Sequence, residues 1–287
     1  MKIYDCFTFY NELDLLELRL HELYNKVDHF VIVESNQTFT NRAKPWNFEQ
    51  NADRFSNYMD KIIYVRVKDM PNSPDAWVND RFQRDQIFRG IKKAKPKDLI
   101  MVSDLDEIIR PAAIDHMIKS DATLFPLRMT ISNFKLNYMK VNPDKYNIWG
   151  MATKRSNFDH IMPDAFRQMR FQFMNAPYQY HSDGVEVIEH GGWHFGYQGD
   201  KEWLLDKAQS FAHTEVNNPE FLAQIDPEAS IAQGTSWDRK SQDKYTVVDL
   251  NNYFPATVVN DPEKYADRLL PNSGTSAFDL LPPFPYN

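Results

Sequence analysis

Three short apolar runs, each the length of one strand, limit the fold of this chain most. They are HFVIVES at 29–35, KIIYVRV at 61–67 and LIMV at 99–102. Runs of this kind are typical of strands that a parallel sheet buries on both faces. An aromatic-rich strand is expected at 2–9, and amphipathic patterns predict helices at 11–27 and 77–94. The order strand, helix, strand, strand, helix, strand predicts a doubly wound α/β sheet, which binds ligands beyond the carboxyl ends of its strands.

The two predicted helices have recognisable faces and ends. In the helix at 11–27 the leucines recur at helical spacing and are expected to face the core, whereas Glu17 and Arg19 are expected on other faces. Asp75 is expected to cap the helix at 77–94, which must end before Pro96.

The second half of the chain is less regular. Helices are expected at 111–119, 163–174, 201–215 and 262–270, and strands at 122–141, 147–155 and 186–197, the last broken by two glycines. A Pro-rich tail, LLPPFPYN, ends the sequence. We find no repeat or flexible linker, so one continuous domain is expected.

Composition narrows the class of protein. The 287 residues are 42% hydrophobic, which is enough for a sizeable core, and the net charge of −7 argues against a surface that binds polyanions as a whole. The one cysteine, Cys6, excludes an internal disulfide and a cysteine-rich zinc site, and it is expected in the core. The sequence contains neither a signal-peptide pattern at its start nor an apolar stretch of about 18 residues. A soluble, unexported protein is therefore expected.

An acidic cluster, SDLDE, follows the LIMV run directly and contains Asp104, Asp106 and Glu107. Carboxylates so close together repel one another unless a positive charge lies among them. In an extended segment Asp104 and Asp106 would point the same way and could approach one ion. Mg²⁺ and Mn²⁺ prefer such oxygen ligands, together with diphosphate oxygens. The cluster therefore predicts an Mn²⁺ or Mg²⁺ site, although an isolated Asp-x-Asp is usually a solvated turn.

Several motifs in order resemble glycosyltransferase family 17, the family of β-1,4-mannosyl-glycoprotein β-1,4-N-acetylglucosaminyltransferase. They are NELDLLELRLHEL, HFVIVESNQTFT, the Lys44-Pro45 pair, SDLDEI and GGWHF. The resemblance is close over residues 1–110 and looser over 185–270. It implies a GT-A nucleotide-sugar-binding fold with a mostly parallel central sheet, a UDP-sugar donor, N-acetylglucosamine as the transferred sugar, a divalent metal at the Asp-x-Asp, and inversion at the anomeric carbon.

The resemblance also divides the single domain, 1–287, into functional parts. Residues 1–110 would form the nucleotide-sugar-binding half, 111–270 the acceptor-side half and 271–287 the Pro-rich tail. Eukaryotic members of the family carry a membrane anchor before the first strand and a Cys after the Gly-Trp-His, whereas here the chain begins at the strand and Phe195 follows His194. We therefore expect a cytoplasmic protein of bacterial or viral origin.

The expected site residues follow from the motifs and the resemblance. Metal ligands are expected to be Asp104, Asp106 and His194, with His213 as a second candidate histidine. Residues expected to bind the donor are Thr8, Glu12, Glu34, Ser35, Arg84, Ser103 and Asp104. Catalytic roles are expected for Asp106, Glu107 and Glu189, the last as the general base ahead of Asp164 and Asp183.

Each of these residues also has a structural alternative. Glu34 would otherwise cap a loop, and Arg84 would otherwise form a helical ion pair with Asp80, four residues away. Lys44 and Arg42 are expected to be solvated rather than bound to phosphate. His194 would otherwise pack among aromatic residues.

Two other functions compete with sugar transfer. A metal-dependent phosphohydrolase could use clustered aspartates, but the sequence shows no second set of carboxylates or histidines with ligand spacing. A non-catalytic carbohydrate-binding protein would explain the 14% aromatic residues but not the acidic cluster. The acceptor stays open between a polysaccharide, a lipid-linked glycan, a protein and a nucleobase.

Overall fold

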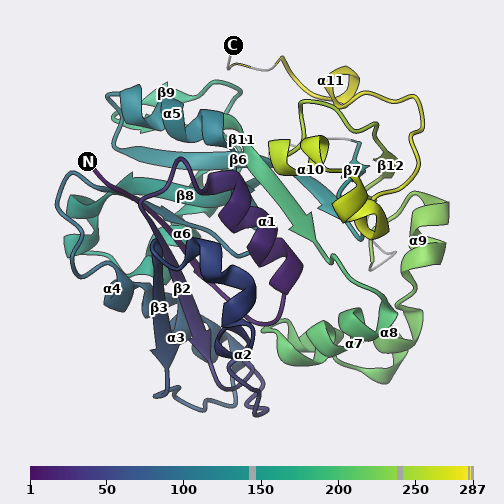
Figure 1. The fold of residues 1–287 in the computed structure, drawn as a ribbon, viewed down its shortest axis with the longest axis horizontal. Helices are drawn as coiled ribbons and strands as arrows, with labels where there is room; N and C mark the ends of the chain where they lie inside the picture. The colour runs from purple at the N-terminus through teal and green to yellow at the C-terminus, as the bar shows by residue number, and fades with distance from the viewer. Residues whose placement is uncertain (142–146, 238–241, 284, 286–287) are drawn as a thin grey trace.

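The computed structural model describes residues 1–141, 147–237, 242–283 and 285, which form an α/β fold around a twelve-stranded sheet. The main path of the sheet runs β12-β7-β6-β8-β4-β1-β2-β3, and β5, β9, β10 and β11 branch from it. Figure 1 shows α1 crossing in front of this sheet and the later helices α7, α8 and α9 grouped to one side of it. The arrangement confirms the α/β class.

The first half contains the predicted parallel strands. They are β1 (Ile3–Thr8), β2 (His29–Ser35), β3 (Ile62–Val67) and β4 (Leu99–Val102). Cys6 pairs with Val31 of β2 on one side and with Val102 of β4 on the other, so all these strands point toward the same edge. The carboxyl ends of β1 and β4 consequently lie next to each other, as a doubly wound sheet requires.

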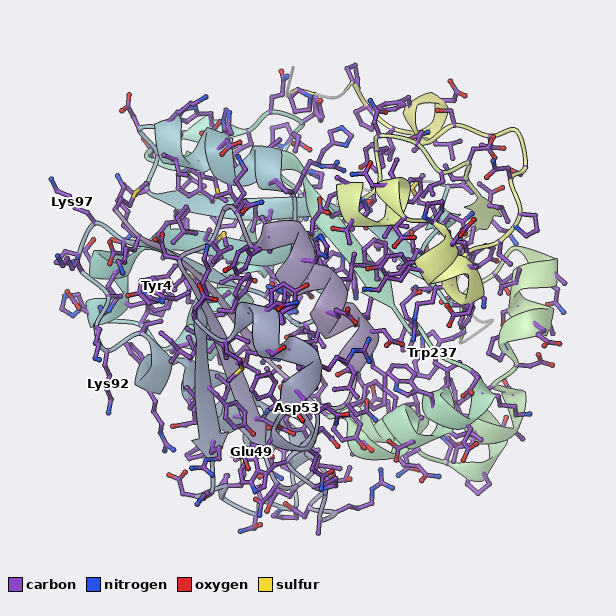
Figure 2. The ribbon with its side chains drawn as sticks, in the orientation of Figure 1. Tyr4, Glu49, Asp53, Lys92, Lys97 and Trp237 are labelled. Atoms are coloured by element: carbon purple, nitrogen blue, oxygen red, sulfur yellow. The ribbon has the colours of Figure 1, made fainter. Side chains whose placement is uncertain are left out.

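Alternate residues of β1 enter two different cores because successive side chains of a strand point to opposite faces. Phe7 packs in a cluster with the leucines of α1 (Leu13–Leu23), and Cys6 packs in a second cluster with Ile87 of α4 (Ile87–Gly90). Cys6 has no exposed surface, which confirms its expected place in the core. Charged side chains such as Lys92 and Lys97 point outward at the edge of the molecule (Figure 2).

Strands of the second half extend the sheet from the β4 edge in mixed directions. They are β6 (Leu124–Asn133), β7 (Tyr138–Lys140), β8 (Ile148–Lys154), β9 (His181–Ser182), β10 (Val185–Glu186), β11 (Ile188–Gly196) and β12 (Tyr245–Val247). β8 runs antiparallel to β4 and to β6, whereas β11 runs parallel to β6 with a register shift between Ile188 and Gly192. The expected break at the two glycines is therefore a local irregularity within a continuous strand.

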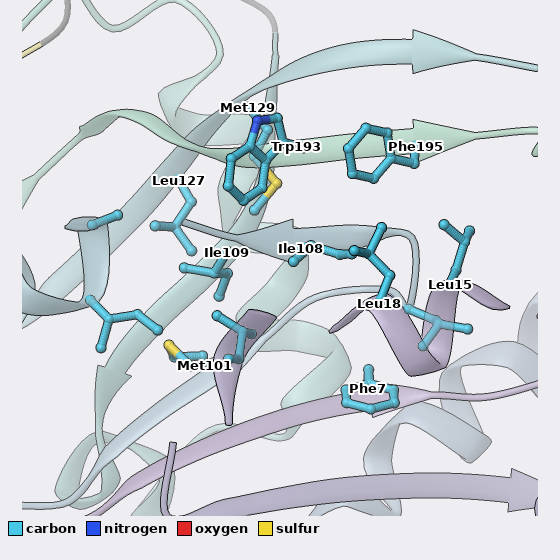
Figure 3. Close-up of a cluster of buried hydrophobic side chains, with 14 of the residues drawn as sticks. Phe7, Leu15, Leu18, Met101, Ile108, Ile109, Leu127, Met129, Trp193 and Phe195 are labelled. Atoms are coloured by element: carbon cyan, nitrogen blue, oxygen red, sulfur yellow. The ribbon is translucent and has the colours of Figure 1, made fainter. Parts of the chain in front are cut away.

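One short strand, β5 (Glu107–Ile109), connects the acidic cluster to the second half. It pairs antiparallel with β11, and Ile108 lies opposite Trp193. Figure 3 shows Ile108 between Leu18 of α1 and the Trp193 and Phe195 rings of β11. Burial of these large apolar side chains holds β11 against the end of β4.

Several predicted helices are shorter or divided. The helix expected at 77–94 consists of α3 (Ala76–Asp85) and α4 (Ile87–Gly90), and Asp75 caps α3 as predicted, accepting from the Trp77 N–H at 2.9 Å. The helix expected at 163–174 is α6 (Pro163–Gln168) followed by the 3₁₀ turn η3 (Met169–Phe173). The helix at 201–215 ends early as α7 (Lys201–Ser210), and 262–270 contains only the 3₁₀ turn η5 (Glu263–Arg268).

The remaining elements are short. α5 (Pro111–Lys119) lies where expected. η4 (Thr214–Val216) overlaps the end of the helix expected at 201–215, and η2 (Arg155–Asp159) begins at the last residue of the strand expected at 147–155. The segments without a predicted element contain α2 (Asn47–Gln50), η1 (Ala52–Tyr58), α8 (Pro219–Gln224), α9 (Pro227–Gln233), α10 (Ala256–Asn260) and α11 (Ala277–Leu280). Residues 284 and 286–287 of the Pro-rich tail lie outside the described residues. In the described ranges, no helix combines the length and the apolar character that crossing a membrane needs.

Arg19 of α1 is buried, contrary to the expectation that it lies on a polar face. Its guanidinium pairs with Asp5 of β1 through Nη2–Oδ1 at 2.6 Å and Nε–Oδ2 at 2.8 Å, and neither side chain is exposed. The same group donates to Ser103 Oγ at 2.7 Å and to the carbonyl oxygens of Asp104 and Leu105 at 2.6 and 3.0 Å. Helical spacing placed Arg19 on the surface. In the structure it is a charged residue of the core, because the Asp5 carboxylate and backbone carbonyl oxygens accept its hydrogen bonds there.

We predict that Arg19→Met lowers the free energy of unfolding by about 3–5 kcal/mol, because it leaves Asp5 buried without a counter-ion. Arg19→Lys should recover only part of this loss, since an ammonium cannot reproduce the planar fork. Urea denaturation measures both variants.

Arg54→Met is the matched control. Arg54 pairs with Asp14 and Glu17 of α1, the helix that contains Arg19, but its side chain is 35% exposed. It should lose less than about 1 kcal/mol. Equal losses in Arg19→Met and Arg54→Met would contradict the special role of Arg19.

Candidate active site

A cavity of about 650 Å³ opens at the carboxyl ends of β1 and β4. One wall is formed by Thr8–Tyr10 after β1 together with residues of α3, and another by residues 167–174 of α6 and η3. The turn after β4 contributes Asp104 and Asp106, and residues 207–213 of α7 and the following segment close the remaining side. Segments from five distant parts of the sequence therefore meet at the edge where an α/β sheet binds its ligands.

The acidic cluster is a tight turn rather than an extended segment. The Glu107 N–H donates to the Asp104 carbonyl at 3.0 Å, and both aspartates line the cavity. Asp104 accepts from Arg84 Nη2 at 3.1 Å and from Arg167 Nη2 at 2.6 Å. Burial alone would raise the pKa of the Asp104 carboxyl, but the guanidinium groups of Arg167 and Arg84 lower it overall. Whether Asp104 and Asp106 jointly bind one ion stays a prediction.

Asp106 instead lies with Glu107 and His194. One ligand atom from each of these residues lies within 4.8 Å of the others. The β5–β11 ladder causes this, because His194 is the direct partner of Glu107 and the Phe195 N–H donates to the Asp106 carbonyl at 2.8 Å. His194 Nε2 lies 3.8 Å from Asp106 Oδ1, and its buried Nδ1 has no hydrogen-bond partner among the described residues. These three side chains could hold a divalent metal.

Glycine at position 192 makes this approach possible. A Cβ atom there would lie 2.2 Å from the carbonyl oxygen of Ile108, which no side chain could tolerate without displacing β5. The GGWH motif thus places His194 beside the acidic turn through close backbone contact, as its glycines indicated. The edge of the Trp149 ring packs against the imidazole, with the centroids 4.4 Å apart.

Basic side chains surround the carboxylates. Arg84 pairs with Asp80, Asp104 and Asp164, and Arg167 pairs with Asp104 and with Glu107 at 2.5 Å. Lys207 of α7 places its Nζ 3.5 Å from Asp106 Oδ2. Burial by itself would lower the pKa of Lys207, but Asp106 raises it overall, so the ammonium keeps its charge.

Five of the predicted site residues line the cavity, namely Thr8, Glu12, Arg84, Asp104 and Asp106. The alternative given for Arg84 also holds, since its pair with Asp80 is present while it faces the cavity. Ser35 and Ser103 do not line the cavity. Their hydroxyls donate to the carbonyl oxygens of Gln37 and Glu107, so both serine side chains are used within the fold.

Glu34 is not open to a nucleoside, because four donors from the protein use its carboxylate. It accepts from Lys44 Nζ at 2.6 Å, from the Asn47 and Phe48 N–H groups at 2.7 and 3.1 Å, and from the Tyr64 hydroxyl at 2.7 Å. Its structural alternative, the capping of a loop, matches this geometry. Lys44 is only 6% exposed, so the expectation that it is solvated is wrong. Arg42 is half-exposed and pairs with Asp206.

Glu189, expected as the general base, lies outside the cavity wall. Glu189 lies five residues before His194 on β11. Its carboxylate pairs with Arg128 Nε at 2.8 Å and accepts from the Gln179 N–H. Of the other base candidates, Asp164 is paired with Arg84, and Asp183 is exposed in a turn. His213 pairs with exposed Glu215 and packs against Trp77, so it does not join the His194 cluster.

Four functional positions escaped the sequence analysis, namely Arg19, Arg167, Arg170 and Lys207. Arg19 had a visible signal, since it is the one arginine within the leucine-rich stretch LDLLELRLHEL. Arg167 and Arg170 are three residues apart in a segment recognised only as helical, and Lys207 lies in an ordinary amphipathic pattern. These basic residues come close to the acidic turn only through the tertiary fold, so no local sequence pattern predicts it.

The fold and the cavity define a class of protein, an α/β enzyme whose site combines a strand-end acidic turn with basic walls suited to a phosphorylated ligand. The family model described as Glycosyltransferase family 17 matches residues 1–266, so the chain belongs to this family. This membership confirms the resemblance read from the motifs.

Mammalian β-1,4-mannosyl-glycoprotein 4-β-N-acetylglucosaminyltransferases are similar to part of the chain. The Rattus norvegicus protein is 30% identical over 116 residues, which cover 37% of this chain and 21% of that protein. The Homo sapiens protein is also 30% identical over 116 residues, covering 37% and 22%. The match thus spans about a fifth of these relatives, which lend no support to the expected bacterial or viral source.

Among solved structures, the chain is similar to an inositol-1-phosphate CTP transferase from T. maritima and to the galactosyltransferase LgtC in complex with donor and acceptor sugar analogues. The first is 11% identical with a TM-score of 0.39, covering 69% of this chain and 90% of that chain. The second is 8% identical with a TM-score of 0.35, covering 96% and 98%.

We predict that Glu34→Gln lowers the free energy of unfolding by about 3–5 kcal/mol, because Lys44 would stay buried without its carboxylate. In the protein that remains folded, the affinity for UDP should change less than twofold, as measured by calorimetry.

Glu49→Gln provides the comparison, since Glu49 pairs with Arg66 through exposed side chains and should cost less than about 1 kcal/mol. A large loss of UDP affinity in Glu34→Gln at unchanged stability would restore the nucleoside-binding role.

Proposed function

We propose that this glycosyltransferase depends on a divalent metal and transfers N-acetylglucosamine from a UDP-sugar, with inversion, to a hydroxyl of its acceptor. The observation that carries the proposal is the Asp106–Glu107–His194 cluster beside a cavity with basic walls. Family membership supports the reaction class. The site supports a bound metal ion, a nucleoside diphosphate and a bound base, as described in turn below.

The side chains of the cluster fit a metal ion. Two carboxylates and one imidazole are a donor set that Mn²⁺ accepts, and carboxylates suit Mg²⁺ as well. The buried Nδ1 of His194, which lacks a partner among the described residues, adds a nitrogen that a ligand could use. A bound ion would act as a Lewis acid toward the diphosphate of the donor. Asp106, Glu107 and His194 would hold the ion. Asp104 would hold Arg84 and Arg167 in place through its ion pairs with them.

Cations of the chain itself support binding of a nucleoside diphosphate. Lys207 Nζ and the Arg84 and Arg167 guanidiniums lie around the acidic turn and line the cavity. Charge-assisted hydrogen bonds from such groups to phosphate are stronger than neutral ones. Lys207 would stabilise the negative charge that develops on the departing UDP, because it already faces the Asp106 carboxylate from α7.

Aromatic side chains at the β1–α3 end of the cavity support a bound base. Phe9, Tyr10 and Phe39 lie there, and the Trp77 ring is 37% exposed. Flat apolar surfaces of this kind bind the planar part of a ligand while polar groups fix its orientation. The uridine would occupy this end, and the sugar would then lie beyond the acidic turn, toward Trp149 and His194.

We predict that Glu107→Gln weakens Mn²⁺ binding by at least about tenfold, because loss of an outer partner of a ligand already costs about 10–100-fold. Asp104→Asn should change Mn²⁺ affinity by less than about threefold, since Asp104 is not one of the three residues whose ligand atoms lie together. Titration calorimetry with Mn²⁺ in the presence of UDP measures both, and release of UDP from UDP-N-acetylglucosamine should follow the same order.

His194→Ala should resemble Glu107→Gln, with His213→Ala as its control, because His213 is half-exposed and outside the cluster. If Asp104→Asn weakens Mn²⁺ binding as much as Glu107→Gln does, the Asp-x-Asp set of ligands holds instead. Full turnover of UDP-N-acetylglucosamine by the parent protein in excess chelator would remove the metal from the mechanism.

A further inference from the structure

Arg170 is a buried cation on the cavity wall that the proposed chemistry leaves without a task. It lies in η3, is 8% exposed and lines the cavity. Its Nη1 makes one long hydrogen bond, 3.4 Å to the carbonyl of Arg167, and its buried Nε has no partner among the described residues. Buried charges in proteins are normally paired, so an unpaired guanidinium needs an explanation.

The other cationic side chains of the cavity wall provide the contrast. Each of them forms an ion pair with a carboxylate of the chain: Lys44 with Glu34, Arg81 with Asp75, Arg84 with Asp104, Arg167 with Glu107 and Lys207 with Asp106. Arg170 forms none with a carboxylate of the described residues. Burial and the neighbouring Arg167 lower the pKa of Arg170 to about 10, which still leaves it charged at neutral pH.

The position of Arg170 in the fold separates it from the nucleoside end of the cavity. η3 packs on β8, which pairs with β4 on the side away from β1. The neighbouring side chains on the cavity wall, Phe171 and Met174, are apolar, and the Phe171 ring is 52% exposed with the guanidinium 4.5 Å from its centroid. A charged group between apolar and aromatic surfaces is typical of a site for a ligand that carries one anionic group.

We propose that Arg170 binds an anionic group, a phosphate or a carboxylate, carried by the acceptor, so that the enzyme acts on an acidic acceptor. The inference rests on the proposed function, because it assigns the nucleoside and the diphosphate to the β1 and β4 side of the same cavity. It distinguishes this chain from relatives whose printed name specifies a mannosyl-glycoprotein acceptor.

Inorganic phosphate is the probe for this subsite, titrated calorimetrically into the protein saturated with UDP and Mg²⁺. One phosphate should bind per chain, and Arg170→Met should weaken it by at least about tenfold, or about 1.4 kcal/mol. The affinity for UDP itself should change no more than twofold. Arg170→Lys should retain part of the phosphate affinity, since it keeps the charge without the fork.

Arg81→Met is the matched control, because Arg81 also lines the cavity but has a carboxylate partner and a 49% exposed side chain. It should alter phosphate affinity by less than about twofold. Thermal unfolding of each variant verifies that it is folded, and Arg170→Lys carries the test if Arg170→Met is not.

Three results would overturn the proposal. Phosphate that fails to bind the UDP-saturated parent, or that binds Arg170→Met as well as the parent, removes the subsite. A tenfold loss of UDP affinity in Arg170→Met assigns Arg170 to the diphosphate of the donor. If the parent does not bind UDP at all, the proposed function fails instead, and phosphate titration of the UDP-free parent and Arg170→Met then tests Arg170 by itself.

The acceptor class has its own measurement. UDP release from UDP-N-acetylglucosamine should be stimulated more by mannose 6-phosphate or glucuronate than by mannose, and Arg170→Met should remove this preference. Stimulation by the neutral sugar alone, undiminished in the variant, would contradict an acidic acceptor.

Discussion

The guanidinium of Arg19 holds the end of β1 and the turn after β4 in one position. It pairs with Asp5 and donates to the Ser103 hydroxyl and to three backbone carbonyl oxygens of the turn, those of Asp104, Leu105 and Glu107. Because these carbonyls point at Arg19, the side chains of Asp104 and Asp106 are directed into the cavity. The site therefore depends on a charge that is inside the core and touches no substrate.

Basic side chains of the chain offset part of the repulsion among the carboxylates of the acidic turn. The repulsion therefore no longer requires a metal ion. Arg84 and Arg167 neutralise Asp104, and Lys207 faces Asp106. A cluster of carboxylates is therefore not by itself an argument for a metal ion. The argument rests on geometry instead, on the ligand atoms of Asp106, Glu107 and His194 within 4.8 Å and on an imidazole nitrogen left without a partner among the described residues.

Sequence patterns predicted the first half of the fold well, because strand periodicity and helix caps are local properties. The acidic turn and His194 were also found, since both stand beside recognisable strand-end or glycine motifs. The directions of side chains were harder. Asp104 turns toward Arg167, Glu34 is used by four protein donors, and Arg19 is buried, all because of partners distant in sequence. Such partners are set by tertiary packing, and no single-sequence pattern reports them.

Some site residues lie in the motifs that resemble the family, and others lie between those motifs. The turn at 103–107 and the GGWHF strand belong to motifs that carry the resemblance, and they assemble the carboxylates and the histidine through the β5–β11 ladder. Arg167 and Arg170 belong to α6 and η3, which lie between the two matched stretches of motifs. A change of Arg170 would leave the ladder and the ion pairs of Arg167 with the acidic turn in place while altering the charge of the opposite wall. On the proposed assignment, reaction chemistry depends on the sheet edge and choice of acceptor on the 3₁₀ turn packed over it, so the two can vary independently.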